Sequence, residues 1–305
     1  MNNIDLCIIG NGPAGLTAAV YAARYGINQV LVGDLPGGLM TSSHKICNYP
    51  SEKEISGMEL SQKMIDQVNF LSVPQIMAQV KSISKIDNSY QLDLSNGENI
   101  ITKTILIATG TKHRHLNLSR EKELTGKGVS YCATCDGMFY KNKVVAVVGG
   151  SDSANTSSLY LSQVADMVYQ IYRKDALRGE TAWINQIKNN QKVKVIYNNE
   201  ITELIGEEKL LAIELKNEFE GKTKITIDGL FIEIGSEPDL NLSKQLNLKT
   251  DRGGYILTNP DQITSQKGVW AAGDITTNSN SFRQIITACA EGAVAVENIF
   301  KFLSK

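Results

Sequence analysis

The chain of 305 residues contains no apolar run long enough to cross a membrane, and its apolar stretches, such as 105–108 and 144–148, are as short as β-strands. Net charge is also nearly absent, since 31 Lys and Arg residues face 32 Asp and Glu residues. This balance argues against nucleic acid as a partner. The N-terminus lacks the basic region of a secretory signal peptide. We therefore expect a cytoplasmic protein with no membrane and no nucleic-acid partner.

Cysteine and histidine are scarce, with five and three residues. Five cysteines make an odd and sparse set, unlike the disulfide framework of a small secreted protein. No Ser-His-Asp order, HExxH pattern or Walker A motif is present. Apolar residues make up 42% of the chain and charged residues 21%, which is typical of a globular protein, and the length suggests two domains.

The first motif that is present is a glycine-rich turn between a predicted strand and a predicted helix. Residues 4–9 are apolar apart from Asp5 and run into GNGPAG at 10–15, after which an alanine-rich segment follows. This is GxGxxG in its required context, where the glycines allow a tight turn, close approach to a pyrophosphate, and close helix–strand packing. Asp34 lies 19 residues after Gly15, at the end of the next predicted strand, 29–33. Its carboxylate can accept a hydrogen bond from a ribose hydroxyl.

The same order of elements returns in the second half of the chain. A predicted strand at 144–148 runs into GGSDSA at 149–154, followed by a predicted helix and a second strand at 167–172. Here the middle position of the turn is a serine. The residue that matches Asp34 is basic, and the predicted ligands of an NADPH 2′-phosphate are Arg173, Lys174 and Arg178. The alternative is a degenerate turn that keeps the fold without the ligand.

Closing strands indicate how the two units are connected. Predicted strands at 104–108 and 230–234 each end in a glycine turn, and a further strand at 268–272 precedes a long amphipathic helix near 283–303. A strand and a helix after the second unit favour nesting. We predict an α/β fold of two nested Rossmann-like, three-layer domains. The first comprises 1–116 and 247–305, and the second, 117–246, is inserted into it.

The most specific feature is CATC at 132–135. Two thiols at this spacing can form a small disulfide and exchange it with another one. Zinc would need a second pair of ligands, and Cys7, Cys47 and Cys289 are scattered, so we predict no metal. Asp136 follows directly, either as a carboxyl group that moves protons to a thiolate or as a helix-capping or solvated residue.

Eight motifs occur in an order that closely resembles the bacterial-type, low-molecular-weight thioredoxin reductases. They are GNGPAG at 10–15, PGG at 36–38, NYP at 48–50, ATG at 108–110, CATCDG at 132–137, GGSDSA at 149–154, AAGD at 271–274 and FRQ at 282–284. The resemblance covers the whole chain. It implies an FAD-dependent oxidoreductase and a homodimer, in which the first domain binds FAD and the second binds NADPH. The partner would be thioredoxin or a thioredoxin-like protein.

The resemblance also implies roles for single residues. Electrons would pass from NADPH through FAD to the Cys132–Cys135 disulfide and then to thioredoxin, with Cys135 facing the flavin, Cys132 attacking the thioredoxin disulfide and Asp136 acting as the acid. The turns and the resemblance together predict an FAD site of Gly10, Gly12, Pro13, Ala14, Gly15, Asp34, Gly37, Gly38, Asn48, Gly110, Asp274, Arg283 and Gln284. The predicted NADPH site consists of Gly150, Ser151, Asp152, Ser153, Arg173, Lys174 and Arg178.

The chain departs from the usual family pattern at Leu39, Ser151, Tyr172 and Lys174, where the family has Gln, Gly, His and Arg. Three of the four lie on the nicotinamide side, so two alternatives stay open. The same flavin and dithiol could receive their electrons from ferredoxin or another donor. Alternatively, the chain could be a small-molecule dithiol oxidase. A flavoprotein redox sensor is a further class, which CATC argues against because a sensor needs no exchange dithiol.

Overall fold

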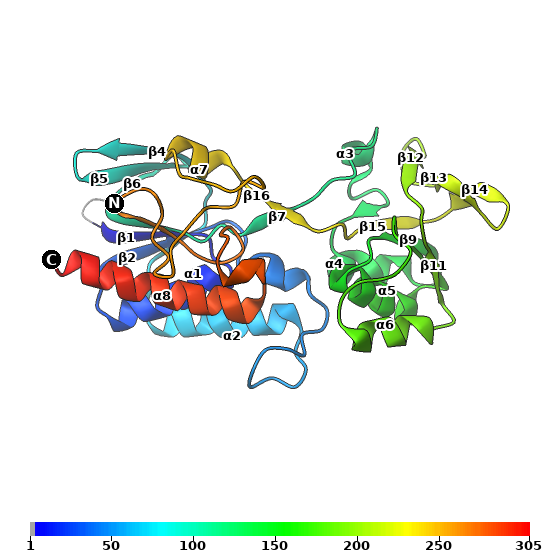
Figure 1. Ribbon diagram of the computed structural model, residues 1–305, viewed down its shortest axis with the longest axis horizontal. Coiled ribbons are helices and arrows are strands. Elements are labelled where there is room, and N and C mark those ends of the chain that lie inside the picture. Colours follow the sequence, from blue (N-terminus) through cyan, green and yellow to red (C-terminus); the bar gives the residue numbers. More distant parts are fainter. Residues whose placement is uncertain (1–3) are drawn as a thin grey trace. The chain divides into compact units, whose positions relative to one another are not determined.

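The computed structural model describes residues 4–305 and divides into two compact units (Figure 1). The first unit consists of the chain through Thr41, Ile46–Lys112 and Glu237–Lys305. The second unit consists of His113–Ser236 together with the short segment Ser42–Lys45. The second unit is thus inserted into the first, as in the predicted nested fold.

The helices and strands follow the predicted order closely. In the first unit they are β1 (Ile4–Ile9), α1 (Pro13–Arg24), β2 (Gln29–Val32), α2 (Gly57–Phe70), β3 (Gln75–Ile76), β4 (Val80–Ile86), β5 (Ser89–Leu94), β6 (Asn99–Ile107), α7 (Asn241–Gln245), β17 (Val269–Ala271) and α8 (Ile285–Leu303). In the second they are α3 (Glu121–Leu124), β8 (Val129–Ser130), α4 (Ala133–Asp136), β9 (Val144–Val148), α5 (Asp152–Val164), β10 (Met167–Ile171), α6 (Thr181–Lys188), β11 (Val193–Ile196), β12 (Ile201–Ile205), β13 (Ala212–Phe219), β14 (Lys222–Thr226) and β15 (Gly229–Ile232). Short 3₁₀ helices lie at Gly38–Ser42, Gly137–Tyr140 and Ser279–Ser281.

The first unit is built on a seven-stranded sheet of order β3-β2-β1-β6-β5-β4, in which β17 also pairs with β6. Strands β1, β2, β3 and β17 are parallel to their neighbours, whereas β4, β5 and the first half of β6 are antiparallel. Strand β6 is long enough to serve both patterns. The carboxyl ends of β1 and β6 therefore meet at one edge, where a dinucleotide binds in such sheets.

Side-chain alternation along the strands explains the two faces of this sheet. On β1, Leu6 and Ile8 pack with α1 and α8, which lie side by side, while Cys7 and Ile9 face the opposite core (Figure 1). That opposite core contains Tyr90 of the β5–β6 hairpin. Apart from Asp5, β1 is apolar on both of its faces because both faces of the strand are covered.

The second unit repeats this plan with a parallel five-stranded sheet of order β11-β10-β9-β15-β8. On β9, Val145 and Val147 pack with α5 and α6, whereas Ala146 and Val148 face an antiparallel sheet of β12, β13 and β14. This architecture confirms the predicted α/β fold of two Rossmann-like units.

Two short strands form the connections between the units. β7 (Thr111–His113) and β16 (Ser236–Pro238) pair with each other as a two-stranded sheet. The division falls at 112/113 and 236/237, whereas the sequence places the joins at 116/117 and 246/247. The second difference is the larger one, because Leu242 and Leu246 of α7 are buried in the core of the first unit. Within residues 4–305, no helix combines the length and apolar content that a membrane crossing requires.

Candidate active site

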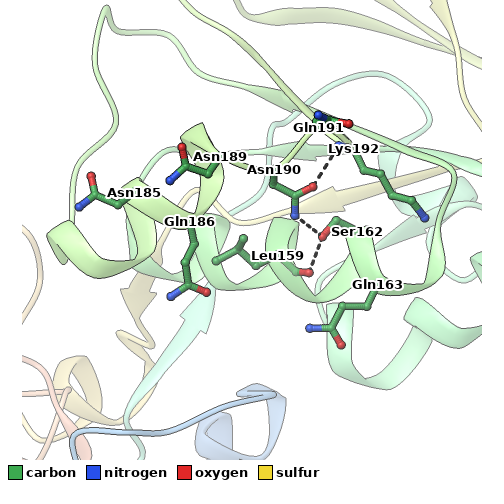
Figure 2. A pocket seen from close by; sticks show the side chains of 9 residues that line it. All are labelled: Leu159, Ser162, Gln163, Asn185, Gln186, Asn189, Asn190, Gln191 and Lys192. Carbon is green, nitrogen blue, oxygen red and sulfur yellow. Dashed lines mark hydrogen bonds between the residues drawn. The ribbon is translucent and has the colours of Figure 1, made fainter.

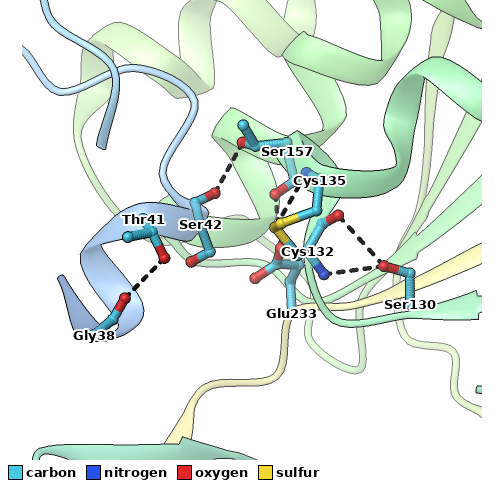
Figure 3. Close-up of a disulfide and its surroundings, with 9 residues drawn as sticks. Gly38, Thr41, Ser42, Ser130, Cys132, Cys135, Ser157 and Glu233 are labelled. Carbon is cyan, nitrogen blue, oxygen red and sulfur yellow. Dashed lines mark hydrogen bonds between the residues drawn. A yellow bond between two sulfur atoms is a disulfide. The ribbon is translucent and has the colours of Figure 1, made fainter. Parts of the chain in front are cut away.

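Cys132 and Cys135 form a disulfide at the start of α4, with their Cα atoms 5.3 Å apart (Figure 3). The backbone N–H of Cys132 donates to Ser130 Oγ at 3.0 Å, which fixes the approach from β8. The backbone N–H of Cys135 donates to Cys132 Sγ at 3.1 Å. This N–H is therefore in place to donate to the Cys132 sulfur when that sulfur takes part in disulfide exchange.

The two cysteines differ in exposure, because Cys135 is exposed and Cys132 is half-buried. The residue assigned the attack on thioredoxin is therefore the less exposed one. Asp136 is half-buried, and its side chain does not cap the helical turn that follows it. The pKa of the Tyr140 phenol is raised by burial and, to a smaller extent, by the charges of Asp136 and Asp228. The side chain of Asp136 is therefore not a helix cap, and its role in proton transfer stays a prediction.

The first glycine turn shows which of its glycines the chain itself requires. A Cβ at Gly15 would lie 1.8 Å from the carbonyl oxygen of Gly10, and one at Gly10, where φ is +107°, would lie 2.2 Å from the oxygen of Ala108. Gly12 differs, because a Cβ there would meet only Gly38 Cα at 3.8 Å and Gly37 O at 3.9 Å. Packing within the chain therefore does not explain the glycine at position 12.

The start of α1 fits the pyrophosphate of FAD. Gly12 is the N-cap, no side chain caps the helix, and its first turn contains no acidic residue. These backbone N–H groups and the positive end of the helix suit an anion. Pro13 and Ala14 lie in this first turn, and the predicted Gly37 is tied to it by its N–H, which donates to Asn11 O at 2.9 Å.

The other predicted FAD residues come from several parts of the first unit. Asp34, exposed after β2, accepts a hydrogen bond from Gln79 Nε2 at 2.6 Å. Asn48 Nδ2 donates to Gln284 Oε1 at 3.1 Å, so two predicted residues that lie far apart in the sequence meet. Gly110 follows the end of β6 and has a positive φ of 63°.

Asp274 and Arg283 are also brought together. Arg283 Nε donates to the backbone oxygen of Asp274 at 3.2 Å, and its guanidinium lies 3.8 Å from the ring centroid of Tyr255. Burial raises the pKa of Asp274 to about 6, against the opposing charge of Arg283. Glu291 of α8 accepts from the N–H of Gly273 at 2.7 Å, which holds the adjoining turn. Tyr255 and Glu291 belong to no motif, so the sequence does not predict their place at this site.

The second glycine turn lies against a tyrosine ring. A Cβ at Gly150 would lie 2.4 Å from the Tyr172 ring, whose hydroxyl is buried without a hydrogen-bond partner in the described part of the chain. Ser151 is the N-cap of α5, and its side chain makes no capping hydrogen bond. Asp152 Oδ1 accepts from the backbone N–H of Glu180 at 2.7 Å. The predicted Ser153 lies beside it in the first turn of α5.

Three predicted cations follow β10. Arg173, Lys174 and Arg178 are exposed, and no acidic side chain pairs with any of them among residues 4–305. An uncapped helix start beside unpaired cations fits a dinucleotide that carries a 2′-phosphate.

A pocket elsewhere in the second unit has no such chemistry. It lies between α5 and α6 and is lined mainly by amide side chains: Leu159, Ser162, Gln163, Asn185, Gln186, Asn189, Asn190, Gln191 and Lys192 (Figure 2). Asn190 Nδ2 donates to Ser162 Oγ, and that hydroxyl donates to Leu159 O. None of its residues belongs to a predicted site. Residues 4–305 also hold no group of three or more His, Cys, Asp or Glu side chains arranged for a metal ion.

A disulfide of this kind on one of two nested dinucleotide-binding units defines a nucleotide-dependent disulfide oxidoreductase. The family model described as pyridine nucleotide-disulphide oxidoreductase matches residues 4–292. The thioredoxin reductase of Listeria innocua is 36% identical over 305 residues, which cover 99% of this chain and 94% of that protein. That of Mycoplasma pneumoniae is 37% identical over 297 residues, 97% of this chain and 94% of that protein.

A solved structure agrees with these relatives. The crystal structure of Lactococcus lactis thioredoxin reductase in its FR conformation matches with a TM-score of 0.93 at 35% identity, and the match covers 99% of each chain. The chain belongs to the thioredoxin reductases of the pyridine nucleotide-disulphide oxidoreductase family. Members of this family use FAD and NADPH, so the predicted family, enzyme class and cofactors are confirmed.

Proposed function

We propose that the chain is a thioredoxin-disulfide reductase that transfers electrons from NADPH, through FAD, to the Cys132–Cys135 disulfide and then to thioredoxin. The observation that carries this proposal is the disulfide at the start of α4, with the N–H of Cys135 directed at Cys132 Sγ, in the unit that also contains the second glycine turn. The relatives named above act as thioredoxin reductases and support the same substrate.

The first unit binds FAD in this proposal, and the second binds NADPH. The uncapped start of α1 holds the pyrophosphate, and Asp34 accepts a hydrogen bond from the ribose. Asn48 and Gln284, which are hydrogen-bonded to each other, also contact FAD. The start of α5 and the cations Arg173, Lys174 and Arg178 hold NADPH. Bound FAD supplies the chemistry that converts a hydride into an electron pair for a disulfide.

The residues of the dithiol do the rest. An electron pair breaks the S–S bond and leaves two thiol groups after proton uptake. The thiolate of Cys132 attacks one sulfur of the thioredoxin disulfide, forms a mixed disulfide and expels the other sulfur as a thiolate, to which Asp136 supplies a proton. Cys135 then attacks Cys132 Sγ, which restores the disulfide and releases reduced thioredoxin.

An apolar surface beside the dithiol supports a protein as the substrate. Met138 and Phe139 directly follow the CATCDG motif and are 60% and 73% exposed. Adjacent exposed apolar side chains of this size next to a reactive site are typical of an interaction surface. We also infer that the protein is cytoplasmic and forms a homodimer. Light scattering of the purified protein tests the dimer by its mass.

Side-by-side reduction under anaerobic conditions tests the proposed function. We expect NADPH to bleach the flavin and, with thioredoxin present, to sustain turnover. NADH should do so more slowly, and reduced ferredoxin should not. If only ferredoxin bleached the flavin, the donor would be wrong while the dithiol assignment stood.

Gly12→Val should give a folded protein without FAD. The structure leaves ordinary contact distances around a Cβ at this position, so the chain tolerates it, but the larger side chain occupies the space that the pyrophosphate needs. Flavin absorbance and circular dichroism of the purified variant measure both effects. Gly15→Val is the contrast, because its Cβ collides with the Gly10 backbone and should prevent folding. Stoichiometric FAD in Gly12→Val would show that the flavin site is misplaced.

Ser151→Gly should improve kcat/KM for NADPH by roughly tenfold, equivalent to about 1.4 kcal/mol. The serine side chain stands where the family has a glycine, at the N-cap of α5, and it keeps the backbone away from a pyrophosphate. Steady-state kinetics measure the change, and KM for thioredoxin and the FAD content serve as internal controls that stay constant. An unchanged KM for NADPH would show that the hydroxyl is accommodated.

A further inference from the structure

The loop that carries the predicted 2′-phosphate ligands folds back onto the second glycine turn. The backbone N–H of Arg178 donates to Gly150 O at 2.6 Å. Two residues further on, the N–H of Glu180 donates to Asp152 Oδ1 at 2.7 Å. Arg178 is nevertheless an exposed residue without an acidic partner in residues 4–305, so its backbone is fixed while its guanidinium stays available.

A pair of buried amides holds the same loop from inside the unit. Asn155 on α5 and Gln170 on β10 are both completely buried. Gln170 Nε2 donates to Asn155 Oδ1 at 2.9 Å and to Gly149 O at 3.2 Å. Asn155 Nδ2 in turn donates to the backbone oxygen of Arg178 at 3.0 Å. A continuous line of hydrogen bonds therefore joins the glycine turn, the sheet, the helix and the loop.

Core packing alone does not account for these two amides. Within the described residues, Gln170 Oε1 is buried without a hydrogen-bond partner, and an unpaired buried acceptor costs free energy. Two aliphatic side chains would avoid that cost, but they would leave the backbone oxygens of Gly149 and Arg178 without these hydrogen bonds. The bond from this pair that reaches the loop ends on Arg178, so its structural effect falls on the residue predicted to recognise the nucleotide.

We propose that Asn155 and Gln170 are positioning residues, which hold the Arg178 backbone at the start of α5 and thereby direct its guanidinium to the 2′-phosphate of NADPH. This inference rests on the proposed use of NADPH. A long, flexible side chain whose backbone is already fixed loses less freedom when it binds, so the loop gains affinity for the phosphate by preorganisation. The pair would then select NADPH over NADH without touching either nucleotide.

Calorimetric titration of the FAD-containing enzyme with 2′,5′-ADP, and with 5′-AMP as the matched ligand without a 2′-phosphate, tests the proposal. We expect Arg178→Ala and Asn155→Leu each to weaken 2′,5′-ADP by about tenfold and to leave 5′-AMP within about twofold. The double variant should bind 2′,5′-ADP no more weakly than Arg178→Ala alone, because Asn155 acts through Arg178. A general loosening of the unit would weaken both ligands.

A second variant tests the loop without disturbing the core. Gly179 is exposed with φ at +115°, and a Cβ there would lie 2.0 Å from Asp152 Oδ1. Gly179→Ala should therefore displace the loop and cause the same selective loss of 2′,5′-ADP, even if Asn155→Leu does not fold. If Arg178→Ala weakens binding but the loop variants do not, or if the losses multiply, the positioning role is refuted while NADPH use stands. If the unmodified enzyme binds both ligands equally, the NADPH proposal itself fails.

Discussion

Replacing either cysteine of the disulfide should reduce thioredoxin turnover by at least about a thousandfold, because each variant lacks half of a two-thiol relay. The two variants should differ in what they trap. Cys135→Ser keeps the attacking thiol and lacks the one that resolves the mixed disulfide. It should therefore form a stable complex with a single-cysteine thioredoxin activated as a thionitrobenzoate disulfide. Cys132→Ser should form little complex, as seen by non-reducing electrophoresis.

The physical reason lies in the short helical turn that carries the dithiol. The N–H of Cys135 donates to Cys132 Sγ and can keep this hydrogen bond to the sulfur as it attacks. Alkylation of Cys135→Ser should accordingly be faster than alkylation of Cys132→Ser at the same pH. Cys135 is the more exposed residue, and stable complex formation by Cys132→Ser would reverse the assignment.

The parts of the fold that the sequence predicts are those with local signals. Both glycine turns lie between a short apolar strand and a helix, and the structure has β1–α1 and β9–α5 at those places. Strands β5 and β6 form a hairpin, and the alternation and the Asn-Gly turn at 96–97 that favour it are also local patterns. The long last helix is present as α8.

The parts that the sequence does not predict depend on distant partners. The second join was displaced because Leu242 and Leu246 look like ordinary helix residues, and only packing assigns them to the core of the first unit. The sheet of β12–β14 was not anticipated, since its strands show mixed alternation with exposed charges. A chain without a distinct linker gives no local sign of where one domain ends.

The site was predicted in the same uneven way. Its glycines, cysteines and terminal cations follow from chemistry at fixed spacing. The contacts that support them do not, because Asn155 and Gln170 appear as polar residues in a helix and a strand, where solvent exposure is the usual expectation. Asp152 was predicted to lie at the nucleotide, and the structure shows its carboxylate holding the N–H of Glu180.

Glu233→Gln should stabilise the protein at pH 8 and leave its stability almost unchanged at pH 4. Glu233 follows β15, and its Oε1 accepts a hydrogen bond from Ser157 Oγ at 2.8 Å. Burial of the carboxyl group raises its pKa to about 7, against the opposing effect of that hydrogen bond. In the unfolded chain a glutamate has a pKa of about 4.3.

The sign of the effect follows from these two values. Between about pH 4 and pH 7 the unfolded state releases the Glu233 proton while the folded state retains it, so the free energy of unfolding falls as the pH rises. Above pH 7 the loss is complete and amounts to about 4 kcal/mol, at 1.36 kcal/mol per pKa unit. Glutamine carries no such charge and avoids this loss.

Urea unfolding at a series of pH values measures the difference. Glu203→Gln on β12, an exposed glutamate, is the matched control and should change stability by less than about 0.5 kcal/mol at either pH. Parallel pH curves for Glu233→Gln and the unmodified protein would mean that the folded state ionises this carboxyl group as readily as the unfolded chain does.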